Sequence, residues 1–583
     1  MEKLINLQLL EKLYNKNCTS NKGFKYAYGT AGFRYNADVL NTVMFTTGIL
    51  SVLRSIYLQN KTIGIMITAS HNPPQDNGVK IVEPMGEMLD QSWESIATDL
   101  ANSASNSYND FITYLNHLIK DKGIDLIDTS NGIGSVIVGR DSRESGPRLL
   151  ETVLDAVYCF QHDSTERVSK ILDAGILTTP QLHYLVYKTN VAKTLEKNEI
   201  GIGCYFDDFT RAWLDLCELY GFSTEHLKFA LTIDAANGVG GFQMEKMISL
   251  LFTSCKTTVD GGNSTNISIV NNDWQKPNLL NNKCGADYVK TNQCLPNGVV
   301  SNSKFSTGGE NTQKLNCSFD GDADRVIFYY QDNENKSSFH LLDGDRISTL
   351  FAKFFQHLLK ESGLLDASDN DIKVGVVQTA YANGNSTKYI TEVLKMDVSC
   401  TPTGVKHLHH EAVEKYDIGI YFEANGHGTI VFSEKIKSLV NNSMSNGNKA
   451  LKTIEIFTRL INRTVGDAIS DMLGVLAVLC ILNLTPQDWY NEYSDLPNKL
   501  IKVVVPDRTV FKTTNAERQL VSPAGLQGKI DELVSSYGAD SRSFVRASGT
   551  EDAVRVYAES STKEMAESLA EKVGQLVSNC CGE

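Results

Sequence analysis

Long apolar runs, cysteine pairs and an excess of positive charge are all missing from this sequence. It has no run of about 18 apolar residues, so no membrane-spanning helix is predicted. The 12 cysteines among the 583 residues include no Cys-x-x-Cys pair. Near the N-terminus, charged residues break up the apolar stretch that a signal peptide needs. We therefore expect reduced thiols in a cytoplasmic protein rather than a disulfide framework.

The charge balance argues against two classes of partner. The chain has 55 Lys and Arg against 69 Asp and Glu, a net charge of −14 at neutral pH. A mildly acidic chain offers no electrostatic footprint for nucleic acid or for an anionic membrane. With 42% hydrophobic and 21% charged residues, the composition is that of a folded globular protein. The length suggests about four domains.

The order of apolar and polar segments predicts an α/β fold. An apolar run, a turn rich in Gly, Asp or Asn, and a segment with helical period follow one another in residues 135–158, 231–252 and 374–394. This alternation indicates largely parallel sheets covered by helices.

Polar stretches punctuate this pattern. The Asn- and Ser-rich segments 101–110, 260–273 and 441–449 are expected to be surface loops. Residues 485–498 contain two prolines and are expected to form a linker. The pattern that follows this segment predicts a small separate α+β domain.

A first polar loop, Thr68 to Lys80 (TASHNPPQDNGVK), follows an apolar strand at residues 63–67. Its Asn-Pro, Pro-Pro and Asp-Asn-Gly steps are turn formers, and α/β folds place their sites where strands end. Ser70 and His71 are adjacent and so rarely face each other. The chain also has no G-x-S-x-G elbow, which argues against a Ser-His nucleophile. On its own the loop is also compatible with a plain surface turn.

A second loop carries Asp320, Asp322 and Asp324 at a spacing of two. Three carboxylates that converge in this way can hold a hard cation, and Mg²⁺ suits such a small set of oxygen ligands. An EF-hand is excluded because Arg325 stands where that loop needs Gly. A dehalogenase-type phosphatase fits poorly, because Asp324 replaces the Thr or Val of its motif. The alternative is a solvated acidic turn.

A third loop, residues 421–429, lies between two predicted strands. Glu423 and Asn425 offer acceptors and donors for neighbouring sugar hydroxyls. Gly426 and Gly428 let the backbone approach a ligand closely. A simple hairpin turn is equally compatible with these residues.

A fourth loop, residues 546–551, combines a guanidinium fork with hydroxyls and exposed backbone N–H groups. Arg546, Ser548, Gly549 and Thr550, with Arg555 downstream, form a plausible cradle for a phosphate dianion. The pattern Arg-x-Ser-Gly-Thr by itself is weakly specific, so an ordinary turn is an equally open interpretation.

Two minor stretches add to the picture. The Gly-rich loop at residues 28–34 could place Arg34 at a phosphate, or be a plain turn. The histidines of residues 403–410 are not expected to form a zinc site. A helix start or a substrate-contacting loop fits this second stretch better.

Taken together and in this order, the loops resemble the α-D-phosphohexomutase superfamily. The sugar loop reads Glu-Ala-Asn-Gly-His where many members have Glu-x-Ser, so it looks like the branch that acts on N-acetylglucosamine phosphates. The resemblance runs from Tyr28 to about Ala558. It implies an α/β fold of four domains around a central cleft, with three related mixed α/β domains and a smaller C-terminal α+β domain.

The same resemblance implies domain bounds and residue roles. The domains would span residues 1–205 with the phosphoserine loop, 206–333 with the metal loop, 334–475 with the sugar-binding loop and 476–583 with the phosphate-binding loop. Catalytic roles are implied for Ser70, Lys80, His71 and Arg34, with Ser70 carrying the phosphoryl group and Lys80 acting as general acid/base. Mg²⁺ would bind Asp320, Asp322, Asp324 and a phosphate oxygen on Ser70. Substrate binding is implied for Glu423, Asn425, Gly426, Arg546, Ala547, Ser548, Gly549, Thr550 and Arg555.

The implied activity is the interconversion of N-acetylglucosamine 6-phosphate and 1-phosphate. It would run through a 1,6-bisphosphate, which would also prime the enzyme, and would feed UDP-N-acetylglucosamine synthesis. The expected partner is a phosphosugar, with no nucleic acid and no membrane, and the sequence does not fix whether the chain is a monomer or a dimer. Three alternatives stay open: a glucose or mannose phosphate mutase, a Mg²⁺-dependent phosphatase, and a catalytically silent sugar-phosphate binder.

Overall fold

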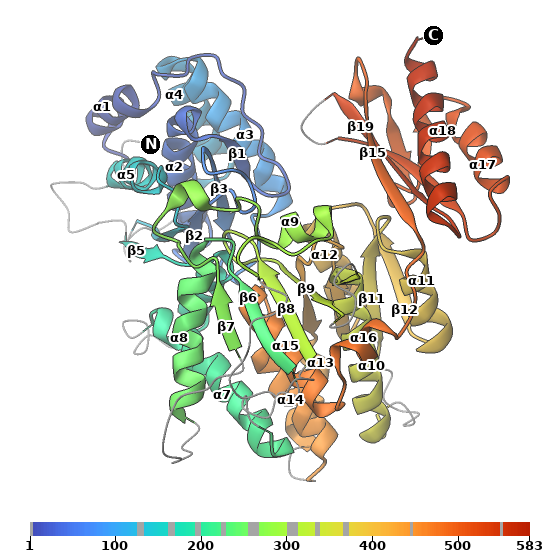
Figure 1. The fold of residues 1–583 in the computed structure, drawn as a ribbon. Helices are drawn as coiled ribbons and strands as arrows, with labels where there is room; N and C mark the ends of the chain where they lie inside the picture. The colour runs from blue at the N-terminus through green and yellow to red at the C-terminus, as the bar shows by residue number, and fades with distance from the viewer. Residues whose placement is uncertain are drawn as a thin grey trace. The chain divides into compact units, whose positions relative to one another are not determined.

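The computed structural model divides the chain into two compact units, Met1–Leu341 with Arg459–Ala477, and Leu342–Thr458 with Val478–Glu583. Figure 1 shows the elements of each unit. The structure describes residues 4–124, 133–160, 170–192, 200–222, 229–254, 267–299, 313–332, 338–364, 372–443, 447–548 and 552–582.

The first sheet of the first unit contains β1 (Phe33–Asn36), β2 (Thr62–Ile67), β3 (Asp76–Val82), β4 (Ser135–Arg140) and β5 (Lys170–Ile176) in the order β1-β3-β2-β4-β5. Strands β2, β4 and β5 are parallel, whereas β3 runs antiparallel to β2 and β1. Every residue of β2 is buried, as expected for a central strand covered on both faces.

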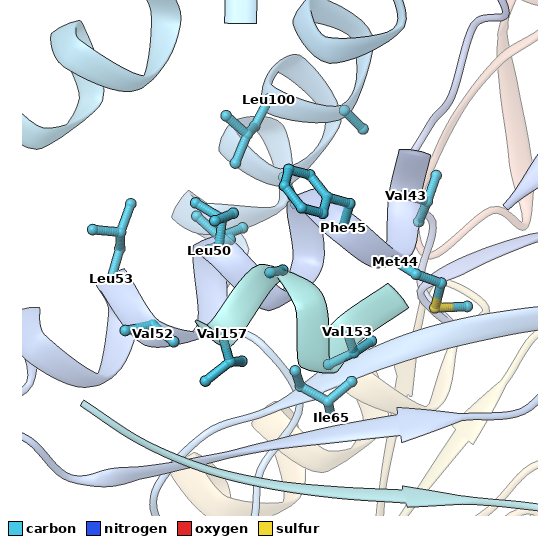
Figure 2. Packing of buried hydrophobic residues seen from close by; sticks show 14 of the residues in the cluster. Val43, Met44, Phe45, Leu50, Val52, Leu53, Ile65, Leu100, Val153 and Val157 are labelled. Carbon is cyan, nitrogen blue, oxygen red and sulfur yellow. The ribbon is translucent and has the colours of Figure 1, made fainter. Parts of the chain in front are cut away.

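Helices α2 (Asn41–Tyr57) and α5 (Gly146–Tyr158) build the core over this sheet. Figure 2 shows Val153 and Val157 of α5 beside Ile65 of β2, with the apolar side chains of α2 behind them. A Cβ at Gly48 would lie 2.6 Å from the Cβ of Ala156, so the glycine allows the two helices to approach closely. Helices α1 (Leu7–Asn17), α3 (Gln91–Asn106) and α4 (Tyr108–Asp121) extend the same core.

The second sheet has the order β10-β9-β8-β6-β7. Strand β6 pairs in parallel with β7 and β8, and β8 pairs antiparallel with β9. Its strands are β6 (Phe229–Asp234), β7 (Ile267–Val270), β8 (Gln313–Phe319), β9 (Val326–Gln331) and β10 (Phe339–Leu342). The helices along this part of the chain are α6 (Thr179–Val191), α7 (Ile202–Tyr220), α8 (Val239–Ser254) and α9 (Ala286–Asn292).

The second unit contains a related sheet with the order β12-β11-β13-β14. Strand β11 is parallel to β12 and β13, and β14 runs antiparallel to β13. The strands are β11 (Val374–Thr379), β12 (Asp397–Thr401), β13 (Ile418–Phe422) and β14 (Gly428–Phe432), with helices α10 (Gly344–Glu361), α11 (Gly384–Lys388), α12 (Val405–Lys415), α13 (Glu434–Ser443) and α14 (Lys449–Leu460). Helix α15 (Ala468–Ile481) follows in the chain.

The C-terminal part is antiparallel. Strand β19 (Ala553–Glu559) lies between β15 (Asn498–Val504) and β18 (Arg542–Ala547), beside a small hairpin of β16 (Lys512–Thr514) and β17 (Gln519–Ser522). Helices α17 (Leu526–Ser535) and α18 (Lys563–Gly582) lie on one side of this sheet (Figure 1). The predicted class, three mixed α/β parts and a smaller α+β part, is confirmed, whereas the predicted domain bounds stay a prediction.

The loop predicted at residues 101–110 and the linker predicted at 485–498 are wrong, and residues 267–270 of the expected loop 260–273 form β7. Residues 101–110 contain the end of α3 and the start of α4, joined at Ser107, whose hydroxyl accepts from the Asp110 N–H and caps α4. Asn and Ser here mark a junction between two helices. The expected linker 485–498 contains α16 (Pro486–Tyr490), whose Trp489 is fully buried and donates from its indole to the Arg346 carbonyl. This segment is packed rather than free.

The structure also bears on the cysteines and on the membrane. The ten cysteines whose side chains the structure describes are free thiols. In that same part of the chain, no helix combines the length and the apolar character needed to cross a bilayer.

Candidate active site

The four loops singled out from the sequence occupy equivalent positions in the fold. Each connects two neighbouring antiparallel strands: β2 to β3, β8 to β9, β13 to β14, and β18 to β19. In the first three sheets the strand that enters the loop is also paired in parallel with another strand. Each of these three loops therefore leaves the carboxyl end of a parallel-paired strand, the edge at which α/β proteins place their ligands.

Ser70 lies in the loop after β2 and is fully buried. Its φ of 52° is in the left-handed region, which is uncommon for a residue with a side chain. The Thr68 hydroxyl accepts from the Ser70 N–H at 3.0 Å and holds this turn. The Ser70 hydroxyl donates to Oδ2 of Asp320 at 2.7 Å. The fold thus joins the first two predicted loops.

The three aspartates follow β8 and are almost completely buried. One oxygen from each of Asp320, Asp322 and Asp324 lies within 4.8 Å of the others. The backbone of Gly321 lies against the Ser70 loop, since a Cβ there would be 2.6 Å from the Ser70 carbonyl oxygen. The Gly321 carbonyl accepts from the Val239 N–H at the start of α8 at 3.2 Å. The loop is therefore fixed from two sides.

Hydroxyls and a lysine surround the carboxylates. Oδ2 of Asp322 accepts from the Thr179 hydroxyl at 2.5 Å, at the start of α6. Lys80 on β3 places its Nζ 3.0 Å from Oδ2 of Asp324 and 3.5 Å from Oδ2 of Asp322. The Nε of Arg325 lies 3.7–3.8 Å from Asp324 and Asp320. The negative charge is thus partly balanced by neighbouring cations.

The carboxylates do not share the same electrostatic environment. Burial, together with the charges of Asp324 and Asp322, raises the pKa of Asp320 well above its usual value. Burial and Asp324 also act to raise the pKa of Asp322, but Lys80, the Thr179 hydroxyl and Arg34 outweigh them and hold it below the usual value. Three carboxylates held this closely repel one another, and a bound cation would relieve that repulsion.

This donor set fits a hard divalent cation. Oδ1 of Asp322 is buried and has no hydrogen-bond partner among the described residues. An acceptor of this kind, next to two further carboxylates, matches the all-oxygen ligation that Mg²⁺ prefers. Among the described residues, these three aspartates are the acidic, His or Cys side chains whose ligand atoms lie close enough together to bind one metal ion.

Arg34 and His71 lie near the same carboxylates. Arg34 on β1 pairs across the sheet with Gly78, and burial and the charge of Arg325 lower its pKa. Nδ1 of His71 lies 3.4 Å from Oδ2 of Asp287 on α9. Burial and the charge of Arg325 lower the pKa of His71 to about 4, so this imidazole is neutral near pH 7. The first unit therefore brings together every predicted catalytic and metal residue.

The sugar loop is ordered by its own hydrogen bonds. The Glu423 N–H donates to the His427 carbonyl at 2.8 Å, and Gly426 turns the chain with a φ of 85°. The Glu423 carboxylate accepts from the Asn425 side chain at 3.3 Å and from the Gly404 N–H at 3.1 Å. Both side chains are half-buried, so polar groups remain accessible to a ligand.

The phosphate loop is described only in part, because Gly549 and Thr550 lie outside the described residues. Arg546 donates from Nε to Oε1 of Glu517 at 2.8 Å, and the Ser548 N–H donates to the Ala553 carbonyl at 2.8 Å. Ala547 packs toward the apolar core of this sheet, so its backbone is the part that can face a ligand. Arg546 and Arg555 are directly opposed on β18 and β19.

Comparison with known proteins gives a consistent result. Family models match residues 201–327 ("Phosphoacetylglucosamine mutase AMG1, domain II"), 343–484 (its domain III), 19–107 (phosphoglucomutase/phosphomannomutase α/β/α domain I) and 500–575 (the C-terminal domain of that family). The phosphoacetylglucosamine mutase of Saccharomyces cerevisiae is 52% identical over 565 residues, which cover 95% of this chain and 96% of that protein. This chain belongs to the phosphoacetylglucosamine mutase family.

Solved structures of this family have the same fold. A crystal structure of N-acetylglucosamine-phosphate mutase in its substrate complex, described as a member of the α-D-phosphohexomutase superfamily, matches with a TM-score of 0.86. It is 48% identical and covers 98% of this chain and 99% of its own. The Aspergillus fumigatus enzyme, in complex with GlcNAc-6P and magnesium, has a TM-score of 0.84 at 42% identity with the same coverage. A variant of that enzyme has been solved with glucose 1,6-bisphosphate.

One residue of the site that the sequence analysis missed is Arg143. It is fully buried after β4 and donates to the Asp141 carboxylate at 3.0 Å. Its two terminal nitrogens donate to carbonyls of the phosphoserine loop at 2.7–2.9 Å, namely those of Ser70, Asn72, Pro73 and Asp76. The signal was a polar Asp-Ser-Arg turn directly after an apolar strand, but which loop it would hold was not visible in the sequence.

A second missed residue is Lys502 on β15. It is directly opposed to Arg555, which in turn opposes Arg546. Directly opposed residues of antiparallel strands share a face, so the three cations form a row across the sheet. Like charges placed opposite each other are unfavourable, and a bound anion would offset their repulsion. Only the strand register identifies Lys502 as part of this face.

Proposed function

We propose that this chain interconverts N-acetylglucosamine 6-phosphate and N-acetylglucosamine 1-phosphate. The observation that carries the proposal is the placement of the Ser70 hydroxyl 2.7 Å from Asp320, beside the two other buried aspartates. Membership of the phosphoacetylglucosamine mutase family, and the complex of a relative with GlcNAc-6P and magnesium, support the choice of substrate.

In this proposal Ser70 carries a phosphoryl group. Phosphoserine 70 transfers it to the free hydroxyl of the sugar phosphate, so that the Ser70 O–P bond breaks and a sugar 1,6-bisphosphate forms. After the bisphosphate has reoriented, Ser70 attacks its other phosphoryl group, which leaves the product with its phosphate at the other position. A sugar 1,6-bisphosphate also primes an unphosphorylated chain, a role supported by the bisphosphate complex of the relative.

The residues around Ser70 supply positioning and charge, which is most of what phosphoryl transfer needs. Asp320, Asp322 and Asp324, with an oxygen of the Ser70 phosphate, would hold one Mg²⁺. The bound ion would neutralise charge on the phosphoryl oxygens. Arg34 would stabilise the same charge from the protein side.

A proton must leave the attacking hydroxyl and later return. We assign this role to Lys80, whose Nζ lies 3.0 Å from Asp324 and so beside the proposed metal ligands. His71 is a neutral imidazole near the same groups and can donate a hydrogen bond to a phosphoryl oxygen. Both assignments are tested by conservative replacement, Lys80→Arg and His71→Asn, with kcat as the readout.

Recognition of the substrate is assigned to the second unit. Glu423, Asn425 and the backbone of Gly426 would bind sugar hydroxyls through the groups described above. Arg546, Ser548, Gly549, Thr550, Arg555 and the backbone of Ala547 would bind the phosphate that does not react. Glu423→Ala and Arg546→Ala are expected to raise KM by on the order of tenfold or more while the melting temperature stays unchanged. Loss of folding in both would indicate a structural role instead.

The decisive experiment is the intact mass of the protein after incubation with glucose 1,6-bisphosphate. One added phosphate, mapped to Ser70 and missing from Ser70→Ala, is expected, together with near-complete loss of turnover in that variant. Ser70→Ala with wild-type turnover, as a phosphatase without a phosphoserine would show, contradicts the proposal. Rates on glucose 1-phosphate, mannose 1-phosphate and N-acetylglucosamine 1-phosphate separate the neighbouring mutase activities, and a silent binder would turn over none of them.

We further propose that the product feeds UDP-N-acetylglucosamine synthesis in the cytoplasm. The free thiols of the described cysteines suit a reducing compartment. Fractionation of cells with an antibody against the chain tests this location.

A further inference from the structure

We propose that Glu517 is a positioning residue for Arg546. Through its hydrogen bonds it also fixes the position of the proposed phosphate site relative to the sugar loop. The proposal rests on the function proposed above, because it assumes that Arg546 binds the phosphate of the substrate. Glu517 lies outside all four loops identified from the sequence, in the turn between β16 and β17.

The contacts of Glu517 reach in two directions. Oε1 accepts from Nε of Arg546 at 2.8 Å. Oε2 accepts from the Thr403 N–H at 2.9 Å and from the Thr403 hydroxyl at 2.6 Å. The side chain is 15% exposed and that of Arg546 is 25% exposed, so this ion pair is largely withdrawn from water. Such charge-assisted bonds are stronger than those between neutral groups.

Thr403 leads directly to the sugar loop. The next residue, Gly404, donates its N–H to Oε1 of Glu423 at 3.1 Å. A short series of hydrogen bonds, with one step along the backbone, therefore runs from Arg546 through Glu517, Thr403 and Gly404 to Glu423. The two groups at its ends are those proposed to bind the phosphate and the sugar hydroxyls. All of these residues belong to the second unit.

The choice of atom on Arg546 matters for binding. The bond to Glu517 uses Nε. Burial acts to lower the pKa of Arg546, but the hydrogen bond and charge of Glu517, with a smaller contribution from Tyr381, outweigh it and raise the pKa. A guanidinium group held through Nε has a fixed plane, and its two terminal nitrogens lie on the edge that can bind phosphate in a bidentate manner. The carboxylate also offsets repulsion between Arg546 and the opposed Arg555.

The backbone of the turn is specialised for this contact. Asn515, Ala516 and Glu517 have φ values of 51°, 53° and 67°. Three successive residues with side chains in the left-handed region are unfavourable by themselves and persist only where surrounding contacts hold them. Within β16 and β17 only Leu520 is buried, and Glu517 provides the bonds to Thr403 and Arg546.

A double-mutant cycle tests the proposal. Glu517→Gln keeps the size of the side chain but leaves one oxygen to serve both partners, and Glu517→Ala removes both bonds. We expect KM for N-acetylglucosamine 6-phosphate to rise by on the order of tenfold in Glu517→Ala and by less in Glu517→Gln. The change in kcat should be smaller. In an Arg546→Ala background, Glu517→Ala should add little, because the partner that it positions is gone.

Controls make the outcomes distinct. Glu532→Gln, exposed on α17 of the same domain, should leave KM unchanged. Calorimetric titration with N-acetylglucosamine 6-phosphate and with unphosphorylated N-acetylglucosamine measures binding without turnover, and the Glu517 variants should weaken the phosphorylated ligand more. If the wild type binds the ligand but does not turn it over, the proposed function fails. The same double-mutant cycle, measured by calorimetric titration, then still tests the role of Glu517. Unchanged binding in both Glu517 variants, or effects that add to that of Arg546→Ala, overturn the positioning role.

Discussion

The hydroxyl of Ser70 donates a hydrogen bond of 2.7 Å to Asp320, a residue 250 positions further along the chain. The two residues belong to different sheets, each in the loop between two antiparallel strands. The contact places the buried Ser70 hydroxyl, the proposed nucleophile, next to the buried carboxylates of the metal loop. The proposed phosphoryl transfer depends on this contact.

Arg143 is expected to be essential for the shape of the Ser70 loop. Arg143→Lys removes the planar fork that reaches several loop carbonyls and the Asp141 carboxylate at once. We expect kcat to fall by on the order of a hundredfold and the first unit to be destabilised by roughly 3 kcal/mol, because buried acceptors lose their donors. Kinetics and thermal melting measure both effects. Arg211→Lys, exposed on α7, is the matched control, and equal behaviour of the two variants contradicts the expectation.

Gly321 is expected to tolerate no side chain. In Gly321→Ala the new Cβ would lie 2.6 Å from the Ser70 carbonyl oxygen and 3.1 Å from the Asn281 side chain, so the metal loop or the Ser70 loop must move. We expect most of the activity to be lost. Gly203→Ala meets nothing within 4 Å and should keep full activity. A Gly321→Ala enzyme with wild-type kcat would show that the contact between the loops is dispensable.

Magnesium should stabilise the protein as well as activate it. Binding to three buried carboxylates relieves their repulsion in the folded state, so added Mg²⁺ should raise the melting temperature and chelation should lower it. Asp322→Asn removes one ligand and should reduce this shift strongly. Asp273→Asn, an exposed aspartate, should keep the wild-type shift. The same Mg²⁺ response in both variants would argue against this site.

His409 should make the stability of the second unit depend on pH. Burial, with a smaller contribution from His410, lowers the pKa of His409 to about 4, and its Nδ1 lies 2.9 Å from the Tyr421 hydroxyl. The folded state therefore binds this proton less readily than the unfolded state, whose pKa is near 6.5. The stability that the neutral ring provides is complete above pH 6.5 and is lost as the pH falls toward 4, by roughly 2 kcal/mol between pH 7 and 5.

His409→Gln should remove most of this dependence. The measurement is the free energy of unfolding of the second unit at several pH values, followed by hydrogen exchange in β13. His410→Gln, an exposed neighbour with the smaller contribution, is the control and should keep most of the pH dependence. An unchanged pH profile in His409→Gln would assign the acid sensitivity to other groups.

Several features of the fold and site were predictable because they are local. The apolar run before Ser70 and the Asp-x-Asp-x-Asp pattern each lie within a few residues, and each is decided by backbone periodicity and turn chemistry. The loop predicted at residues 101–110 is wrong because packing with distant parts of the chain, rather than local pattern, decides the structure there. The Asn and Ser residues of this segment favour loops, but buried Ala101 and Ala104 pack into the core and keep the segment helical.

The amino-acid sequence by itself determined the α/β class, the four polar loops and the chemical types of the side chains in them, because these follow from short-range pattern. Only the tertiary structure decided that Ser70 meets Asp320, that Arg143 binds the carbonyls of the Ser70 loop, and that Glu517 links Arg546 to Thr403. Such contacts join residues far apart in the chain. They depend on sheet order, strand register and close packing, which no single stretch of sequence specifies.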